Sequence, residues 1–167
     1  MFTLTSKGIS DGIISPEYGC RGDCREGIPQ FSLPLEWSDP PKGTVSFALV
    51  FQDYDNIPEE GFSWIHWLIA DIPSDRTCLP ENASRQDISL VQGRNSWMAP
   101  FPQYRKDTDI TDHYGGPAPG QPHNYEFRLY ALDKMLHMEP GFYYNQLLSA
   151  MKGHVLDEAV LSAVYKP

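Results

Sequence analysis

Two long stretches of the chain alternate bulky hydrophobic residues with smaller or polar ones. The first is Thr44–Tyr54, where the bulky positions are Val45, Phe47, Leu49 and Phe51. In the second, the apolar positions are His123, Tyr125, Phe127, Leu129 and Ala131, and they alternate with Asn124, Glu126, Arg128 and Tyr130. Successive side chains of a strand point to opposite faces, so both stretches predict strands with one buried face.

Residues Phe62–Pro73 form a third strong pattern, dense in aromatic and β-branched residues. One face would carry Trp64, His66, Leu68 and Ala70, and the other Ser63, Ile65, Trp67 and Ile69. Because both faces are largely apolar, we expect this strand to be covered on both sides. The short turn Asn56–Gly61 favours an antiparallel hairpin, which would bring the Asp53 end of one strand beside Trp64 and His66.

The other predicted elements are shorter. Phe2–Thr5 and Leu33–Trp37 are predicted as extended segments, and Tyr143–Gly153 as a helix with Leu147, Leu148 and Met151 on one side. Val155–Tyr165 predicts a short helical turn followed by a final strand, Leu161–Tyr165. The segments 16–31 and 93–112 predict long loops, and a loop as long as the second is typical of a lid or a binding surface.

Composition places these elements in one β-rich unit. The chain has 167 residues, of which 41% are hydrophobic, which is enough for one core and predicts a single domain over residues 1–167. Pro 15 and Gly 13, spread among short apolar runs, indicate many turns. The fold class expected is therefore mainly β, with one or two short helices near the C-terminus.

Charge and targeting signals exclude several classes of protein. The net charge of −9 argues against a nucleic-acid partner, because such proteins carry a basic surface. No apolar run approaches the length of a membrane span, and the N-terminus lacks the apolar region of a signal peptide, so a soluble, cytoplasmic protein is expected. The three cysteines fit a reducing compartment, although a Cys20–Cys24 bridge stays open.

Candidate chemistry lies in three separate segments. Asp53 and Asp55 continue the bulky apolar face of their strand, where an ionised carboxylate needs a partner; the alternative is that the strand has ended and both acids are solvated. His66 and His123 lie on apolar faces, where a lone histidine is usually structural. The loop Tyr114–Gly120 has three glycines and two prolines, so we expect a stiff path with open backbone amides.

Together these motifs resemble the phosphatidylethanolamine-binding protein family, in its bacterial Raf-kinase-inhibitor-like branch. The resemblance rests on Asp53-x-Asp55, Gly61, Trp64-x-His66-Trp67, Gly116-Pro117 and His123-x-Tyr125, supported by Leu35-Glu36-Trp37, Pro41-x-Gly43, Ile72-Pro73, Gly93-x-Asn95 and Phe127–Leu132. It covers nearly the whole chain. It implies an antiparallel, sandwich-like Greek-key β fold with a small anion pocket at one end.

The resemblance also implies the ligand and the residues that bind it. Phosphate or a phosphoryl head group, free or on a phospholipid, would be bound by Asp53, Trp64, His66, Gly116, Pro117, His123 and Tyr125. Imidazole, phenol and amide donors suit phosphoryl oxygens, and a carboxylate can fix a histidine tautomer. In place of the family's usual Asp-Pro-Asp-Ala-Pro, this chain has Asp53-Tyr54-Asp55-Asn56-Ile57-Pro58. The 97–112 segment is also longer than expected for the bacterial branch, and it is expected to cover or extend the pocket.

Three function classes follow. The first is a binding protein with no catalytic residue, metal or cofactor, and a regulatory role of the kinase-inhibitor type is one form of this class. The second is a hydrolase that uses His66 or His123 as base with Asp53 to orient it, although Gly61–Ile65 does not match the Gly-x-Ser-x-Gly motif. The third is an inhibitor that binds a kinase or protease through its surface. The resemblance further implies a homodimer, and no protein partner can be identified.

Overall fold

A computed structural model describes all 167 residues, Met1–Pro167. The strands are β1 (Thr3–Thr5), β2 (Ile9–Ser10), β3 (Ile13–Ile14), β4 (Cys24–Arg25), β5 (Ile28–Pro29), β6 (Leu35–Ser38), β7 (Ser46–Asp53), β8 (Trp64–Pro73), β9 (Cys78–Leu79), β10 (Val91–Gly93), β11 (His123–Leu132) and β12 (Val155–Tyr165). The helices are α1 (Ile57–Glu60), α2 (Ala83–Gln86), α3 (Thr108–Thr111) and α4 (Tyr144–Met151), with 3₁₀ turns at Pro16–Tyr18 and Ser96–Met98. The mainly β class is confirmed.

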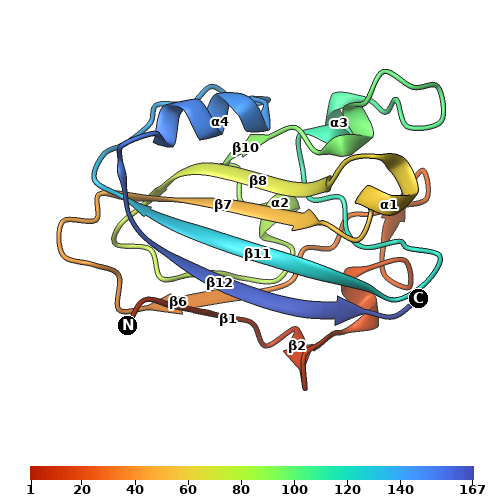
Figure 1. The fold of residues 1–167 in the computed structure, drawn as a ribbon, viewed down its shortest axis with the longest axis horizontal. Helices are drawn as coiled ribbons and strands as arrows, with labels where there is room; N and C mark the ends of the chain where they lie inside the picture. The colour runs from red at the N-terminus through yellow and green to blue at the C-terminus, as the bar shows by residue number, and fades with distance from the viewer.

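The centre of the molecule is a seven-stranded sheet in the order β10-β8-β7-β11-β12-β3-β2 (Figure 1). Its long strands pair antiparallel, and β12 pairs with the short β3 in parallel. The order β11-β7-β8-β10 is that of a Greek key, because the chain returns from β10 through residues 94–122 to place β11 beside β7. This return brings the start of β11 to the end of β7.

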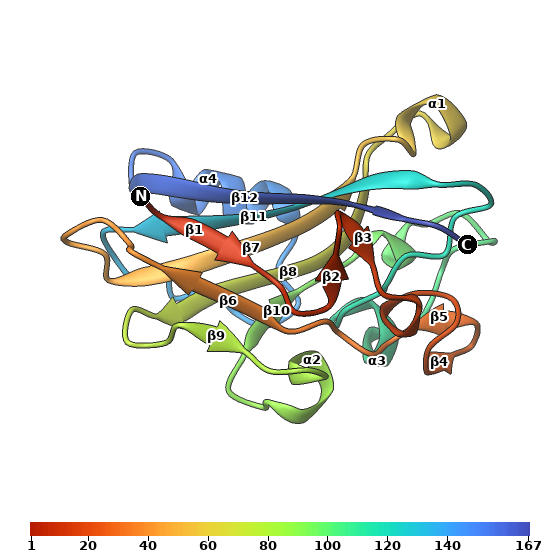
Figure 2. The same cartoon turned by 90° about the horizontal axis from the view of Figure 1, so that it is seen from below.

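A small second sheet, β1-β6-β9, covers one face of the large sheet (Figure 2). The main hydrophobic core lies between them: Phe2 and Leu4 of β1 and Trp37 of β6 pack with residues of β7, β8 and β11. Phe51 stacks on Phe127 with ring centroids 3.9 Å apart, which joins β7 to β11 across this core. The sandwich-like arrangement thus follows from burial of one apolar sheet face on another.

The helix α4 covers the opposite face of the large sheet. Leu147 and Met151 pack there with Ala48, Val50 and Leu68, in a second hydrophobic cluster. The helix was predicted correctly, but the prediction that Leu148 shares its buried side is wrong, since Leu148 is 45% exposed. No helix is long and apolar enough to span a membrane.

Two sequence predictions are corrected by this arrangement. Strand β7 was predicted to bury one face, but every residue of Ser46–Asp53 is buried, because α4 covers the second face. The segment Val155–Tyr165 was predicted to begin with a helical turn, but all of it is strand β12, held by antiparallel pairing along β11. Cys20, Cys24 and Cys78 are free and exposed, so no Cys20–Cys24 bridge is present.

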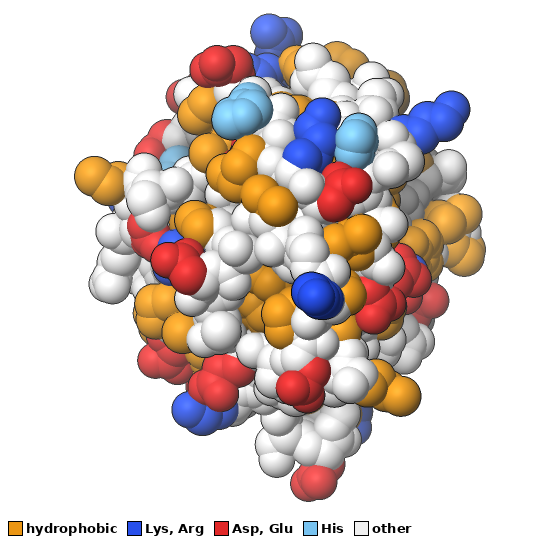
Figure 3. Space-filling view, turned by 90° about the vertical axis from the view of Figure 1, so that its left-hand side faces the viewer, with side chains coloured by type: hydrophobic (Ala, Val, Ile, Leu, Met, Phe, Trp, Pro, Cys, Tyr) orange, Lys and Arg blue, Asp and Glu red, His pale blue; other side chains and the backbone are white.

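The end of the molecule away from α1 and α3 carries a mixed surface. Basic, acidic and hydrophobic side chains are interspersed on this face, with histidine side chains among them (Figure 3). Neither sign of charge dominates the face. The chemistry-bearing segments predicted from the sequence lie at the other end.

Candidate functional site

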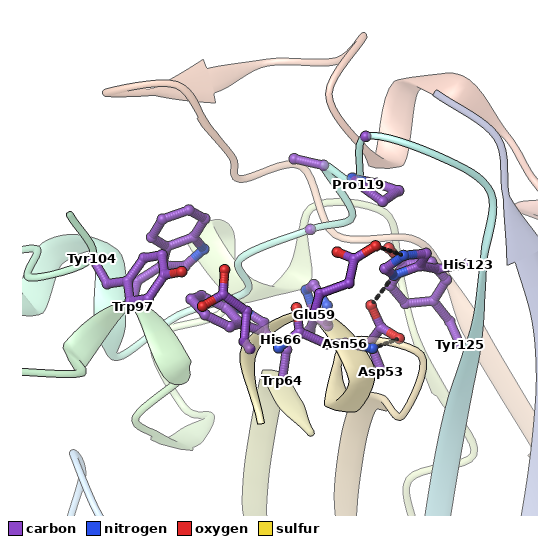
Figure 4. Close-up of a pocket in the computed structure, with 14 residues that line it drawn as sticks. Asp53, Asn56, Glu59, Trp64, His66, Trp97, Tyr104, Pro119, His123 and Tyr125 are labelled. Carbon is purple, nitrogen blue, oxygen red and sulfur yellow. Dashed lines mark hydrogen bonds and ion pairs between the residues drawn. The ribbon is translucent and has the colours of Figure 1, made fainter. Parts of the chain in front are cut away.

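Strand pairing brings the predicted site residues together at the end of the large sheet beside α1. Asp53, the last residue of β7, pairs with Trp64 of β8 on one side and with Tyr125 of β11 on the other. The predicted hairpin, with the Asp53 end beside Trp64, is therefore correct. A cavity of about 180 Å³ opens at this end. Its lining residues are Asp53, Asn56, Glu59, Glu60, Trp64, His66, Trp97, Tyr104, Gly116, Ala118, Pro119, Gly120, His123 and Tyr125 (Figure 4).

A β-bulge in β8 sets the position of His66. Phe51 pairs with Trp67 and Gln52 with Ile65, so His66 is an extra residue without a partner on β7. Its ring lies 5.0 Å from that of Phe51 and 5.2 Å from that of Tyr125. The prediction that His66 shares one face with Leu68 and Ala70 is wrong, because those two residues lie in the cluster under α4.

His66 is neutral and offers an acceptor to the cavity. Its Nδ1 donates to the carbonyl oxygen of Gly115 at 2.5 Å, and its Nε2 is buried without a hydrogen-bond partner. Burial lowers the pKa of His66 to about 4, since charging the ring would require desolvation of a cation. With its proton on Nδ1, the ring presents the lone pair of Nε2, and a ligand atom that meets it must donate.

His123 differs from His66 in its charge. Its Nδ1 lies 2.7 Å from Oδ2 of Asp53, and its Nε2 lies 3.3 Å from Oε1 of Glu59. Burial opposes the charged form, but the hydrogen bonds and negative charges of Asp53 and Glu59 outweigh it, so the pKa of His123 is raised. Both ring nitrogens face carboxylates, which favours the imidazolium, with both N–H groups donating (Figure 4).

Glu59 extends from α1 across the cavity mouth. The helix has a proline in its first turn and ends at Gly61, whose φ of 88° is left-handed. The Glu59 side chain is 42% exposed, and its Oε1 also accepts from Nε2 of Gln121 at 2.8 Å. Glu59 thereby links α1 to the loop before β11 and occupies the position on His123 that an anion would take. The sequence was expected to form only a turn here, and Glu59 was not predicted as a site residue.

The Gly-Pro loop forms another wall, but not as expected. The N–H groups of Gly115 and Gly116 donate to the carbonyl oxygens of His66 and Pro29, both at 2.9 Å, so the prediction that the loop leaves its amides open is wrong for these two. The N–H groups of Ala118 and Gly120 have no partner in the protein, and both residues line the cavity. Pro117 is buried and does not line it, unlike the other six predicted residues.

An aromatic wall faces His123 from the other side of the cavity. Trp97 and Tyr104 come from the long segment after β10 and pack against Trp64. Figure 4 shows Trp97 and Tyr104 together at the far side from His123. The segment 97–112 therefore extends the cavity, as expected, although these two residues were not predicted individually. Asp55 instead accepts from the backbone and side-chain nitrogens of Asn124, both at 2.8 Å, and does not line the cavity.

The sequence and the structure were compared with those of known proteins. A family model described as phosphatidylethanolamine-binding protein matches residues 5–166. The chain belongs to the phosphatidylethanolamine-binding protein family. The predicted resemblance is therefore confirmed, and it covers almost the entire chain.

Relatives in the phosphatidylethanolamine-binding protein family include proteins of several bacteria. Bacillus subtilis YxkA is 45% identical over 137 residues, covering 80% of each chain. The crystal structure of a phosphatidylethanolamine-binding protein homologue from Chlamydia trachomatis is 34% identical with a TM-score of 0.78, covering 99% of this chain and 97% of the other. The crystal structure of Escherichia coli YbcL has 28% sequence identity and a TM-score of 0.78. The match covers 99% of this chain and 98% of the YbcL chain.

Proposed function

We propose that the protein binds a small phosphoryl-containing ligand, either phosphate or a phospholipid head group, in the cavity at the end of β7, β8 and β11. The observation that carries this proposal is that both ring nitrogens of His123 face carboxylates, which raises its pKa and favours the imidazolium. An imidazolium in a recess donates strong hydrogen bonds to phosphoryl oxygens. The free N–H groups of Ala118 and Gly120 add two neutral donors. Membership of a family named for phosphatidylethanolamine supports the same ligand class.

The histidines also favour one protonation state of the ligand. A phosphoryl oxygen can reach Nε2 of His123 only by replacing Glu59, whose side chain is exposed enough to move. The buried Nε2 of His66 accepts, so it pairs with a P–OH group better than with a bare P–O⁻. The second pKa of a phosphomonoester is about 6, so we expect the monoanion to bind more tightly than the dianion.

A titration of inorganic phosphate and phosphorylethanolamine, followed through the histidine NMR signals, tests this function. Saturable shifts at His66 and His123 are expected, and for the ester they should be stronger below its second pKa of about 6 than above it. His123→Ala should abolish them. His154→Ala is the matched control, since the His154 ring is partly exposed, bonds only to Asp133 and lies outside the cavity.

The outcomes separate the candidate functions. Equal shifts of the His66 signal in wild type and His123→Ala would refute the pocket assignment. Release of product from a phosphate ester, lost in the same variant, would instead support the hydrolase prediction. A protein partner retained by His123→Ala but lost on changing residues 97–112 would support the inhibitor prediction.

A further inference from the structure

We infer that the wall formed by Trp64, Trp97 and Tyr104, here called the aromatic corner, is a subsite for a methylated ammonium group. The inference rests on the proposed function, since it places the ammonium on the same ligand as the phosphoryl group. The phosphoryl group would face His123 and the ammonium would face the aromatic corner. The ligand class is then a zwitterion with a phosphoryl group and an N-methylated amine.

The arrangement of the three rings suits the binding of a cation. The ring of Trp64 lies 5.0 Å from that of Trp97 at 73° and 4.9 Å from that of Tyr104 at 79°. Trp97 and Tyr104 are 5.9 Å apart at 74°. Three planes that are pairwise close to perpendicular make the corner of a box, and all three residues line the cavity. Aromatic faces attract cations electrostatically, and assemblies of such rings bind quaternary ammonium groups.

The charges of the cavity support the same conclusion. Its lining includes three carboxylates, on Asp53, Glu59 and Glu60, and one residue favoured as a cation, His123. Glu60 interacts with the phenol of Tyr104 and raises its pKa, which places this carboxylate beside the aromatic corner. A dianionic ligand would add to this negative excess, whereas a zwitterion leaves it unchanged and brings a positive charge to Glu60.

Buried polar atoms argue for a ligand rather than an empty recess. His66 is 5% exposed, lines the cavity, and its Nε2 has no partner. An unpaired buried acceptor is costly unless a ligand or water satisfies it. A trimethylammonium group has no N–H to donate, so the P–OH of the same ligand is left to meet His66 while the methyl groups lie against the rings.

The test compares phosphocholine with 3,3-dimethylbutyl phosphate, which has the same shape but carbon in place of the positive nitrogen. Calorimetry should give about tenfold tighter binding of phosphocholine to the wild type, which lies between the sizes of an exposed and a desolvated cation–π contact. Tetramethylammonium chloride alone should shift the indole NMR signal of Trp97. Inorganic phosphate, bound at His123, reports separately on the proposed function.

Matched variants show which residues cause the preference for phosphocholine. Tyr104→Leu and Glu60→Gln should each remove most of the preference for phosphocholine over its carbon isostere, because that preference reports the positive charge alone and a general change in phosphate affinity affects both esters equally. Tyr54→Leu is the control for an exposed tyrosine that does not line the cavity, and Glu17→Gln is the control for an exposed acid.

Two results would overturn the inference. If phosphate binds but phosphocholine and its carbon isostere bind equally, the aromatic corner is not an ammonium subsite, although the proposed function stands. A preference that survives in both Tyr104→Leu and Glu60→Gln would place the ammonium elsewhere. If phosphate and both esters fail to bind while tetramethylammonium shifts Trp97, the proposed function fails, and with it the zwitterionic ligand.

Discussion

Replacing Glu59 by Gln should change both the charge of His123 and the affinity for phosphate. The carboxylate of Glu59 lies 3.3 Å from Nε2 of His123 and is the only group bonded to that nitrogen. Glutamine has nearly the same shape, and its side-chain oxygen can still accept from Gln121. The variant therefore removes one negative charge from the cavity mouth with little change in packing.

The size of the effect follows from the distance. Two unit charges 3.3 Å apart interact by about 1.3 kcal/mol in bulk water. We use the value for water because the Glu59 side chain is 42% exposed and its charge is screened. One pKa unit corresponds to about 1.4 kcal/mol, so the pKa of His123 should fall by about one unit. Loss of the competing carboxylate should also raise phosphate affinity by about tenfold at pH values where His123 stays charged.

The free energy of unfolding should also be lower in Glu59→Gln than in wild type. A histidine whose pKa is raised by folding stabilises the protein fully below its unfolded pKa, and this contribution is lost as pH rises through the folded pKa. Glu59→Gln should therefore be less stable than wild type by about 1 kcal/mol between pH 5 and 6, with the difference vanishing at alkaline pH.

An NMR titration of the His123 imidazole, with phosphate binding by calorimetry, measures these changes. Glu60→Gln is the matched control, because Glu60 follows Glu59 on α1 and lines the same cavity but does not bond to His123. An unchanged pKa of His123 in Glu59→Gln, or the same shift in both variants, would refute the reasoning.

Three further predictions concern single side chains. His66, with a pKa lowered to about 4, should not titrate near neutral pH by NMR, and its burial should make the free energy of unfolding fall between about pH 6.5 and 4; a titration near 6.5 would contradict its assigned environment. Gly116→Ala should destabilise by about 1–3 kcal/mol in urea and weaken phosphate binding, since a Cβ would meet the carbonyl oxygen of Tyr18, whereas Gly120→Ala, which meets open space, should behave as wild type; equal effects would contradict this. Asp71→Ala should cost about 1–3 kcal/mol without affecting binding, because the Asp71 carboxylate accepts from the backbone N–H groups of residues 136–138; unchanged stability would refute that role.

The long strands and the residues at their ends could be predicted from the sequence, because both depend on local patterns. His123–Leu132 alternates buried and less buried residues as its period-two pattern indicates. The short turn after Asp53 favours a hairpin, so Asp53 was expected to lie beside the start of β8, and it pairs there with Trp64. The resemblance then supplied the long-range proximity of His123 and Asp53, which no local pattern contains.

The tertiary structure decided what depends on contacts between distant segments. Val155–Tyr165 is strand throughout because it pairs along β11, although its first residues are largely exposed and show no clear alternation. The bulge at His66 arises from the register between β7 and β8, and it alone turns His66 toward Tyr125. Glu59 and the residues Trp97 and Tyr104 reach the cavity only through α1 and the long return of the chain to β11. Their types are unremarkable in the sequence, because their chemistry comes from the charges and rings that folding places beside them.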